Sequence, residues 1–243
     1  MLPLRRMAAA MCRAVHRNYT MSASKLLDQR QEMALEENCI VVDNDDHAIG
    51  CATKRECHRV DPNGMLILHR AFSVFVFNSK GELLLQKRSP QKITFPGCYT
   101  NACCSHPLFD IPAEREEEEA QGVRKAAQRR LQYELGIPSS EVPLDSLRYL
   151  TRIHYKAGMD EVWGEHEIDY VIVLHRDVTL NPNPEEVSDI LYINRDQLNS
   201  FLRTVKSPLT PWFNLIAQDH LCQWWDNLHQ LNHYEDHQTI HRF

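Results

Sequence analysis

Short runs of apolar residues recur along the chain, and polar or turn-forming residues bound most of them. The runs at 39–43, 71–77, 82–86, 147–155, 169–175 and 190–193 are predicted to be β-strands. The second and third runs flank Asn78-Ser-Lys-Gly81, which predicts a β-hairpin with Gly81 at the position that needs a positive φ.

Two longer segments are predicted to be helices. Residues 114–135 begin with acids and end with bases, an order that suits the helix dipole, and Gly136 and Pro138 then end the segment. We interpret the acidic run as a solvated first turn. Residues 211–231 carry apolar side chains at three- and four-residue spacing, which indicates a face that packs on a core. Strands and helices without an internal repeat predict one α+β domain.

The N-terminal residues 1–32 are predicted to be a leader in front of a folded domain of residues 33–243. The leader has several Arg residues and no acid before Asp28, which is typical of a mitochondrial transit peptide. The alternative is a disordered extension upstream of an internal start such as Met21. The final three residues, ending at Phe243, loosely resemble a peroxisomal tail. We expect a cytoplasmic or peroxisomal protein, with mitochondrial targeting as the alternative.

Composition narrows the class of protein. The 243 residues are 43% hydrophobic and 25% charged, which is ordinary for a globular domain, and the net charge of −6 argues against broad nucleic-acid binding. No apolar run approaches the ~20 residues of a membrane span. The eight cysteines include no C-x-x-C pair, which argues against a zinc ribbon. Adjacent Cys103 and Cys104 favour a reducing compartment and free thiols.

The central stretch, Asn101-Ala-Cys-Cys-Ser-His-Pro107, follows a Pro- and Gly-containing segment and is predicted to be a turn. It places a thiol two residues from an imidazole, so an acid–base or nucleophilic cysteine could lie beside a metal ligand. Taken alone, the same residues are more simply explained as small buried hydrophobes and a core histidine.

A candidate metal set consists of imidazoles and carboxylates from separate segments, namely His58, His69, His106, Glu165 and Glu167. If the last segment is extended, its two carboxylates share one face and repel each other unless a cation or proton lies between them. Such a mixed nitrogen and oxygen site suits Zn²⁺, Mn²⁺ or Mg²⁺. The alternative is a set of unrelated surface groups.

A candidate anion set consists of the basic residues Lys54, Arg88, Lys92 and Arg130. If they converge on one pocket, they favour a phosphate or diphosphate. Ordinary solvated charge is the alternative, because surface Lys and Arg need no partner.

Several segments together carry a resemblance that covers about residues 33–243. They are Thr53-Lys-Arg-Glu-Cys-His58, Leu68-His-Arg-Ala-Phe72, Phe95-Pro-Gly-Cys-Tyr-Thr-Asn101, Cys103-Cys-Ser-His-Pro107, Trp163-Gly-Glu-His-Glu-Ile-Asp-Tyr170 and Thr210-Pro-Trp-Phe213. In this order they resemble the type I isopentenyl-diphosphate isomerases of the animal kind. The resemblance implies the Nudix fold, a mixed β-sheet sandwiched by helices, here with an N-terminal extension.

The Nudix box departs from the hydrolase pattern G-x5-E-x7-R-E-U-x-E-E-x-G-U, in which U is a large aliphatic residue. Arg115 and Gln121 stand where the leading Gly and Glu belong, and Arg130 and Tyr133 replace two acids, so only Glu134 of the metal-binding glutamates remains. A diphosphohydrolase needs several carboxylates to hold its metals. The departure argues against the runner-up function, a Nudix hydrolase.

The resemblance implies reversible migration of a C=C bond between isopentenyl and dimethylallyl diphosphate, a step of isoprenoid and sterol biosynthesis. The reaction needs an acid and a base on opposite faces of the C5 unit and no water near the carbocation. Cys104 and Glu167 are implied as that pair, with Tyr155 hydrogen-bonded to Glu167 and Trp212 covering the cation. Which of the pair delivers each proton stays open.

The resemblance also implies two metal positions and a diphosphate grip. His58, His69, His106, Glu165 and Glu167 are implied to hold Mg²⁺, with Mn²⁺ or Zn²⁺ as alternatives suggested by the imidazoles. A second Mg²⁺ is implied to bind with substrate at Glu134. The diphosphate is implied to contact Lys54, Arg88, Lys92, Ser105 and Arg130. We expect a monomer whose partner is a small isoprenoid diphosphate; a catalytically silent isoprenoid-diphosphate sensor is the alternative from another class.

Overall fold

The computed structural model describes residues 30–243. Contacts within the chain separate the residues up to Glu36, of which 30–35 are helical, from a compact unit formed by Glu37–Phe243. Most of the predicted leader lies outside the described residues, so its boundary stays a prediction. The fold described below is that of the compact unit.

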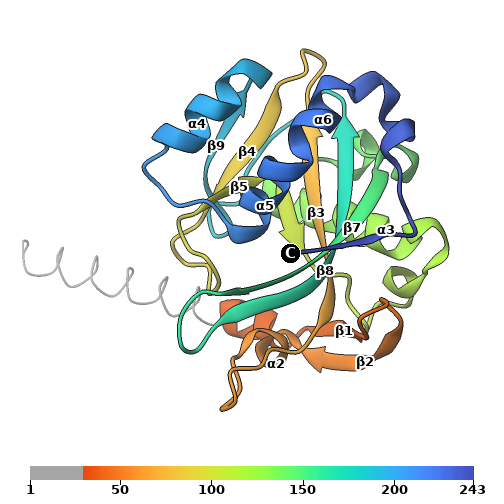
Figure 1. Cartoon of the computed structure of the whole chain (residues 1–243), viewed down its shortest axis with the longest axis vertical. Helices are drawn as coiled ribbons and strands as arrows, with labels where there is room; N and C mark the ends of the chain where they lie inside the picture. Colours follow the sequence, from red (N-terminus) through yellow and green to blue (C-terminus); the bar gives the residue numbers. More distant parts are fainter. Residues whose placement is uncertain (1–29) are drawn as a thin grey trace, which may run out of the picture. The chain divides into compact units, whose positions relative to one another are not determined.

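The compact unit is built on a mixed β-sheet (Figure 1). A central path runs β10–β7–β8–β3–β1–β2, and β4 extends it by pairing with β3, β5 and β9, while β6 pairs with β3. β3 and β8 are parallel, and β7 pairs with β8 antiparallel over nearly its full length. The strands are β1 (Asn38–Val42), β2 (Ala48–Thr53), β3 (His69–Phe77), β4 (Leu83–Arg88), β5 (Tyr99–Asn101), β6 (Cys103–Ser105), β7 (Arg148–Gly158), β8 (Gly164–His175), β9 (Val187–Ile193) and β10 (Ile240–Arg242).

Helices cover both faces of this sheet, with α3 on one side and α5 and α6 on the other (Figure 1). The predicted sandwich of a mixed sheet between helices is therefore confirmed. The α-helices are α2 (Lys54–His58), α3 (Gln121–Leu135), α4 (Leu198–Thr204), α5 (Pro211–Asp219) and α6 (Leu221–Asp226). Short 3-10 helices lie at Pro112–Arg115, Glu118–Ala120, Ser139–Glu141, Leu144–Ser146, Arg195–Gln197 and Leu228–Tyr234.

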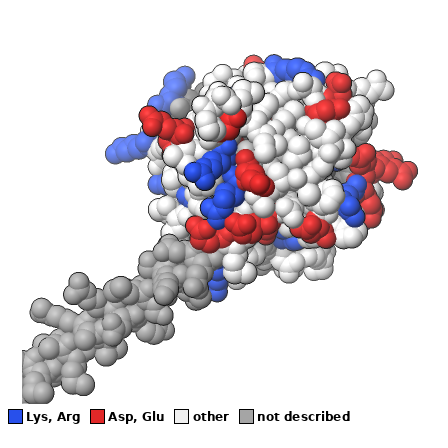
Figure 2. Space-filling view, turned by 90° about the horizontal axis from the view of Figure 1, so that it is seen from below, with Lys and Arg blue, Asp and Glu red and all other residues white. Residues whose placement is uncertain are grey.

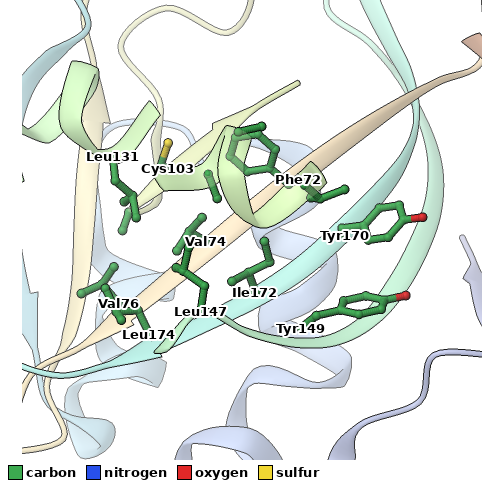
Figure 3. Close-up of a cluster of buried hydrophobic side chains, with 14 of the residues drawn as sticks. Phe72, Val74, Val76, Cys103, Leu131, Leu147, Tyr149, Tyr170, Ile172 and Leu174 are labelled. Atoms are coloured by element: carbon green, nitrogen blue, oxygen red, sulfur yellow. The ribbon is translucent and has the colours of Figure 1, made fainter. Parts of the chain in front are cut away.

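Two hydrophobic cores result because successive side chains of β3 point to opposite faces. Val74 and Val76 pack with Leu131 of α3 on one face (Figure 3), whereas Phe75 and Phe77 pack under α5 and α6 on the other. Replacing either buried Phe with Ala would cost about 3–5 kcal/mol. The strand is buried along its whole length, which explains why its sequence is an almost continuous apolar run.

The first predicted helix begins seven residues later than expected, at Gln121 rather than Glu114. Ala120 has φ of 56°, a left-handed conformation that separates the acidic run from α3. Glu114 folds back over the helix start, so closely that a Cβ on Gly122 would lie 2.2 Å from its carbonyl oxygen. Its side chain is buried and accepts hydrogen bonds from Arg129, so this acid is not part of a solvated first turn.

The second predicted helix, residues 211–231, is broken rather than continuous. Backbone kinks at His220 and Asn227 divide it into α5, α6 and the 3-10 helix Leu228–Tyr234. The apolar spacing correctly identified a core face, because Phe213, Ile216 and their later neighbours are buried together.

The turn predictions had mixed outcomes. Gly81 and Gly136 both have positive φ, of 74° and 65°, so the hairpin turn and the end of α3 are confirmed. The central stretch is not a turn: β5 and β6 flank Ala102 within it and both join the sheet. Backbone pairing of β5 with β4 and of β6 with β3 stabilises this extended conformation.

The outer surface carries both signs of charge. On the face shown in Figure 2, Lys and Arg side chains alternate with Asp and Glu rather than forming a uniformly basic surface. Among residues 30–243, no helix combines the length and apolar character needed to cross a bilayer. The seven cysteines of that part of the chain are free thiols, as predicted, and Cys12 lies outside it.

Candidate functional site

One pocket gathers most of the predicted site residues from distant parts of the chain. Strands β3, β4, β6, β7 and β8 contribute to its wall, together with α2 and the start of α5. It is lined by Lys54, His58, Phe72, Ser73, Arg88, Lys92, Thr94, Cys104, Ser105, His106, Arg130, Tyr155, Glu165, Glu167 and Trp212.

The short helix α2 presents both a basic and an imidazole side chain to this pocket. Thr53 and Glu56 form a capping box, in which the Thr53 side chain accepts from the Glu56 amide and the Glu56 carboxylate accepts from the Thr53 amide. The T-x-x-E pattern is a sequence signal for a helix start, but the sequence analysis missed it. The cap fixes a single turn that carries Lys54 at its start and His58 at its end.

Three imidazoles converge on one carboxylate at the floor of the pocket. Nitrogen and oxygen atoms of His58, His69, His106 and Glu167 lie within 4.8 Å of one another, and all four residues are buried. The Nε2 atoms of these histidines lie 3.7, 3.3 and 2.9 Å, respectively, from Glu167 Oε1. The three rings stand at centroid separations of 4.8 to 5.0 Å.

In two of these rings, a hydrogen bond at Nδ1 fixes Nε2 as the nitrogen that faces the centre of the cluster. His58 Nδ1 donates to the Lys54 carbonyl at 2.8 Å, and His69 Nδ1 donates to the Ile67 carbonyl at 2.9 Å. The lone pairs on Nε2 therefore face inward, and neither Nε2 atom has a hydrogen-bond partner. Buried polar atoms without partners are rare, and imidazoles oriented by carbonyls are typical of metal ligands. The residues therefore fit a divalent cation.

The electrostatics of this cluster also suit a cation. Burial lowers the pKa of His58 well below its ordinary value and that of His106 to about 3, so both rings are neutral. Burial alone would raise the pKa of Glu167, but the hydrogen bond with His106 and the nearby His69 imidazole lower it well below its usual range. A buried carboxylate among imidazoles provides the anionic and neutral ligands that divalent ions take.

The predicted carboxylate pair lies on one face of β8, as expected for alternate residues of a strand. Tyr155, from the neighbouring strand β7, donates towards Glu167 Oε2 at 2.5 Å and lies 3.0 Å from Glu165 Oε2. Burial and the charge of Glu167 raise the pKa of Glu165 to about 8. Glu165 lines the pocket but is not one of the four converging residues.

The two adjacent cysteines of β6 point in different directions. Cys103 is fully buried in the core on the α3 side (Figure 3), whereas Cys104 lines the pocket. Cys104 Sγ lies 3.1 Å from Asn101 Oδ1 and accepts from Trp212 Nε1 at 2.9 Å. Burial, followed by the nearby Asp169 carboxylate, raises the pKa of Cys104 to about 12. At neutral pH this group is therefore a thiol.

Trp212 forms an aromatic wall beside that thiol. It lies at the start of α5, where Thr210 Oγ1 donates to Thr100 Oγ1 at 2.8 Å and thus ties the helix to β5. Phe95 packs edge-on against its ring at 5.5 Å, and the Arg88 guanidinium lies 5.7 Å from its centroid. The aromatic rings and the thiol leave an apolar surface on this side of the pocket.

The lining also includes four basic residues, called the basic end of the pocket below, and most of them already bind protein acceptors. They are Lys54, Arg88, Lys92 and Arg130. Arg88 donates to the Thr94 and Phe95 carbonyls, which holds Phe95 at φ of 48°. Arg130 Nη2 donates to Glu134 Oε1 at 2.6 Å. Lys92 forms an ion pair with buried Glu186.

The structure thus brings together nearly all of the predicted site residues. His69 lies beneath the lining, within the imidazole cluster, and Glu134 lies behind Arg130, where Gln86 also donates to it at 3.2 Å. The sequence analysis missed Ser73, Thr94 and Glu186. Ser73 sits inside an apolar strand and Glu186 in an acidic turn, so neither has a local sequence signal.

Comparisons with known proteins agree with this arrangement. The family model described as NUDIX domain matches residues 67–213. The chain is 52% identical to the Isopentenyl-diphosphate Delta-isomerase 1 of Bos taurus over 219 residues, which covers 89% of this chain and 96% of that protein. It is 46% identical to the Isopentenyl-diphosphate delta-isomerase 2 of Homo sapiens, with the same coverage. The Isopentenyl-diphosphate Delta-isomerase of Dictyostelium discoideum is 46% identical and covers 86% of this chain and 90% of its own length. The chain therefore belongs to the isopentenyl-diphosphate Delta-isomerase family, within the NUDIX fold.

Proposed function

We propose that this protein interconverts isopentenyl diphosphate and dimethylallyl diphosphate. The observation that carries the proposal is the pairing, in one pocket, of the Cys104 thiol and the Glu167 carboxylate between an aromatic wall and a set of basic side chains. Family membership at about half identity supports the same activity.

The chemistry requires a proton to be added to one carbon and another to be removed two carbons away. An acid adds a proton to the terminal CH2 of the alkene, whose π electrons form the new C–H bond and leave a tertiary carbocation. A base then takes a proton from the adjacent CH2 next to the oxygen-bearing carbon, and those C–H electrons form the new double bond. The two groups must lie on either side of the C5 unit in a site without free water.

Cys104 and Glu167 are our candidates for these two roles. Tyr155 supports Glu167 by donating a hydrogen bond to its Oε2 atom. Trp212 supports Cys104 in the same way, through its indole N–H. The Trp212 ring would also stabilise the carbocation through its π face, by ~1–2 kcal/mol or more in a dry site.

His58, His69, His106 and Glu167 would hold a divalent cation, with Glu165 as a further ligand. When bound, this ion would withdraw charge from Glu167 and fix the position of that carboxylate. We favour Mg²⁺, with Mn²⁺ or Zn²⁺ as alternatives favoured by the imidazoles. A second Mg²⁺ is proposed to accompany the substrate at Glu134.

The diphosphate would be held by the basic end of the pocket, through Lys54, Arg88, Lys92, Ser105 and Arg130. Its binding energy is remote from the reacting carbons and places them beside the acid and the base. Hydrolysis of a nucleoside diphosphate derivative is the weaker candidate, because acids of the hydrolase box are replaced in α3.

NMR of the purified chain with isopentenyl diphosphate and Mg²⁺ in D₂O tests the proposal, with Cys104→Ala in parallel. We expect dimethylallyl diphosphate with deuterium incorporated from the wild type and no conversion by the variant. Unlabelled, unconverted substrate would favour a binding protein. Release of phosphate would favour a hydrolase.

A further inference from the structure

Glu186 is a buried acid at the basic end of the pocket, and the proposed reaction does not use it. It lies directly before β9 and is 6% exposed. Its amide donates to the Asn183 carbonyl at 3.0 Å, and its carbonyl accepts from the Ser89 amide at 2.9 Å. Backbone hydrogen bonds therefore fix this residue independently of what its carboxylate contacts.

Two cations of the pocket share one oxygen of this carboxylate. Lys92 Nζ forms an ion pair with Glu186 Oε2, and Arg130 Nη2 lies 3.4 Å from the same atom. Both cations line the pocket, whereas Glu186 is not among the lining residues. Glu186 thus contacts Lys92 and Arg130 from outside the pocket lining, whereas a bound anion would contact the same two cations from within the pocket.

The electrostatics of the site favour charged forms of both partners. Burial alone would raise the pKa of Glu186, but Lys92 and Arg130 overcome it and lower the pKa to about 2. Burial lowers the pKa of Lys92 to about 8 in spite of Glu186, so the lysine is mostly protonated at neutral pH. The two cations are therefore partly neutralised by the protein before any ligand arrives.

We propose that Glu186 is an internal counter-anion that competes with the diphosphate of substrate and product for Lys92 and Arg130. This inference rests on the proposed function. On binding, hydrogen bonds of the two cations shift from the carboxylate oxygen towards phosphate oxygens, and the remaining carboxylate charge repels the ligand. Glu186 therefore acts as a positioning residue that limits affinity, and not as a catalytic residue.

A limit on affinity suits this reaction, because substrate and product carry the same diphosphate. Contacts to that group stabilise the ground states and the transition state alike, so tighter binding would lower KM without accelerating chemistry and would slow product release. An unpaired buried Lys or Arg would also destabilise the empty site. The Glu186 carboxylate would both limit the affinity for the diphosphate and pair with the two buried cations.

Calorimetric titration of inorganic pyrophosphate into the full-length chain in the presence of Mg²⁺ tests the inference. Glu186→Gln keeps the shape of the side chain and a hydrogen-bond acceptor but removes the negative charge. The dissociation constant of pyrophosphate should therefore fall by about tenfold or more, which is a modest part of the Coulomb interaction between charges at such short range. Glu118→Gln, at an exposed position before α3, is the matched control and should bind as the wild type does.

Kinetics give a second readout that a merely structural role would not produce. In Glu186→Gln, KM should fall in parallel with the dissociation constant, while kcat should stay constant or fall because product leaves more slowly. Glu186→Asp moves the charge back by one methylene and should shift both constants in the same direction by a smaller factor. It also serves as the test if the Gln variant does not fold.

Unchanged or weaker pyrophosphate binding in the folded variants, or a raised KM, would overturn the inference, because the carboxylate would then only orient the cations. Failure of the proposed function looks different. In that case the wild type and both variants would leave isopentenyl diphosphate unconverted, while the ratio of their pyrophosphate affinities would still report on Glu186.

Discussion

The two ends of the pocket satisfy their charged and polar groups in different ways. At the imidazole end, the Nε2 atoms of His58 and His69 are buried and have no hydrogen-bond partner. At the basic end, Arg88, Lys92 and Arg130 each bind acceptors supplied by the protein. The first end offers two unpartnered nitrogens that suit a cation, whereas the cations of the second end are already paired with protein groups.

This difference indicates that a cation at the imidazole end and a diphosphate at the basic end should have different residence times. A buried nitrogen without a partner costs roughly 1–3 kcal/mol, so an ion at the imidazole end would contribute to the stability of the fold. Ion pairs within the protein stabilise the cations of the basic end when no ligand is bound. A ligand there can therefore be exchanged in every catalytic cycle. We expect a resident cation beside an exchangeable diphosphate.

The largest expected effect is that of Glu167→Gln, which breaks the imidazole end. Loss of one negative charge should reduce turnover by about a thousandfold or more, because acid–base catalysis and cation binding both depend on this carboxylate. Turnover and bound metal should be measured together on the same preparation. Turnover like that of the wild type would remove Glu167 from the mechanism.

Removal of metal by a chelator should destabilise the fold, since it leaves two buried nitrogens without partners. The expected loss is about 3 kcal/mol in the free energy of unfolding, or several degrees in Tm. Thermal melts with and without EDTA measure it, and added Mg²⁺, Mn²⁺ or Zn²⁺ should restore Tm. An unchanged Tm would show that the imidazole cluster is stable without an ion.

Alkylation of Cys104 tests the state of the thiol between the two ends. The pKa of Cys104 is raised to about 12, so little of the reactive thiolate is present at pH 8. The rate of alkylation at Cys104 should therefore rise with pH towards 12. Allowing for the greater nucleophilicity of a more basic thiolate, iodoacetamide should react about 30-fold more slowly than with an ordinary thiol. Peptide mass spectrometry can compare Cys104 with exposed Cys51 in the same sample. Faster reaction at Cys104 would contradict this prediction.

At the basic end, Arg130→Met should raise KM by about tenfold and leave kcat nearly constant, because the diphosphate is bound in ground and transition states alike. Loss of the guanidinium also leaves Glu134 and Glu186 facing the ligand. Arg148→Met, which removes a charge at an exposed surface ion pair, is the control. A fall in kcat with constant KM would place Arg130 in the chemical step.

The smallest effect should come from deleting residues 1–27. We expect activity and Tm of the shortened chain to match those of the full chain, because the predicted site and core residues all lie later in the sequence. Activity assays and thermal melts of both forms decide it. A clear drop in Tm would show that the leader belongs to the folded domain.

The sequence by itself determined the strands β1, β3, β4, β7, β8 and β9 and which of their residues share a face, but it did not reveal β2, β5, β6 or β10. Alternation is a local property, so Glu165 and Glu167 could be assigned to one face of β8 before the fold was known. Gly81 and Gly136 similarly encode their own turns, since few other residues adopt positive φ readily. The resemblance of the motifs identified the family, and the comparisons confirm it.

Only the tertiary structure decided where α3 begins, where the C-terminal helix breaks and how the charges pair. Glu114 reads as one acid in a run of acids, yet contact with Arg129 buries it and moves the start of α3 to Gln121. Glu186 likewise gains its partner Lys92 from a residue far away in the chain. Ion pairing and helix kinking are decided by neighbours that only the folded chain brings together, so no local pattern could have predicted them.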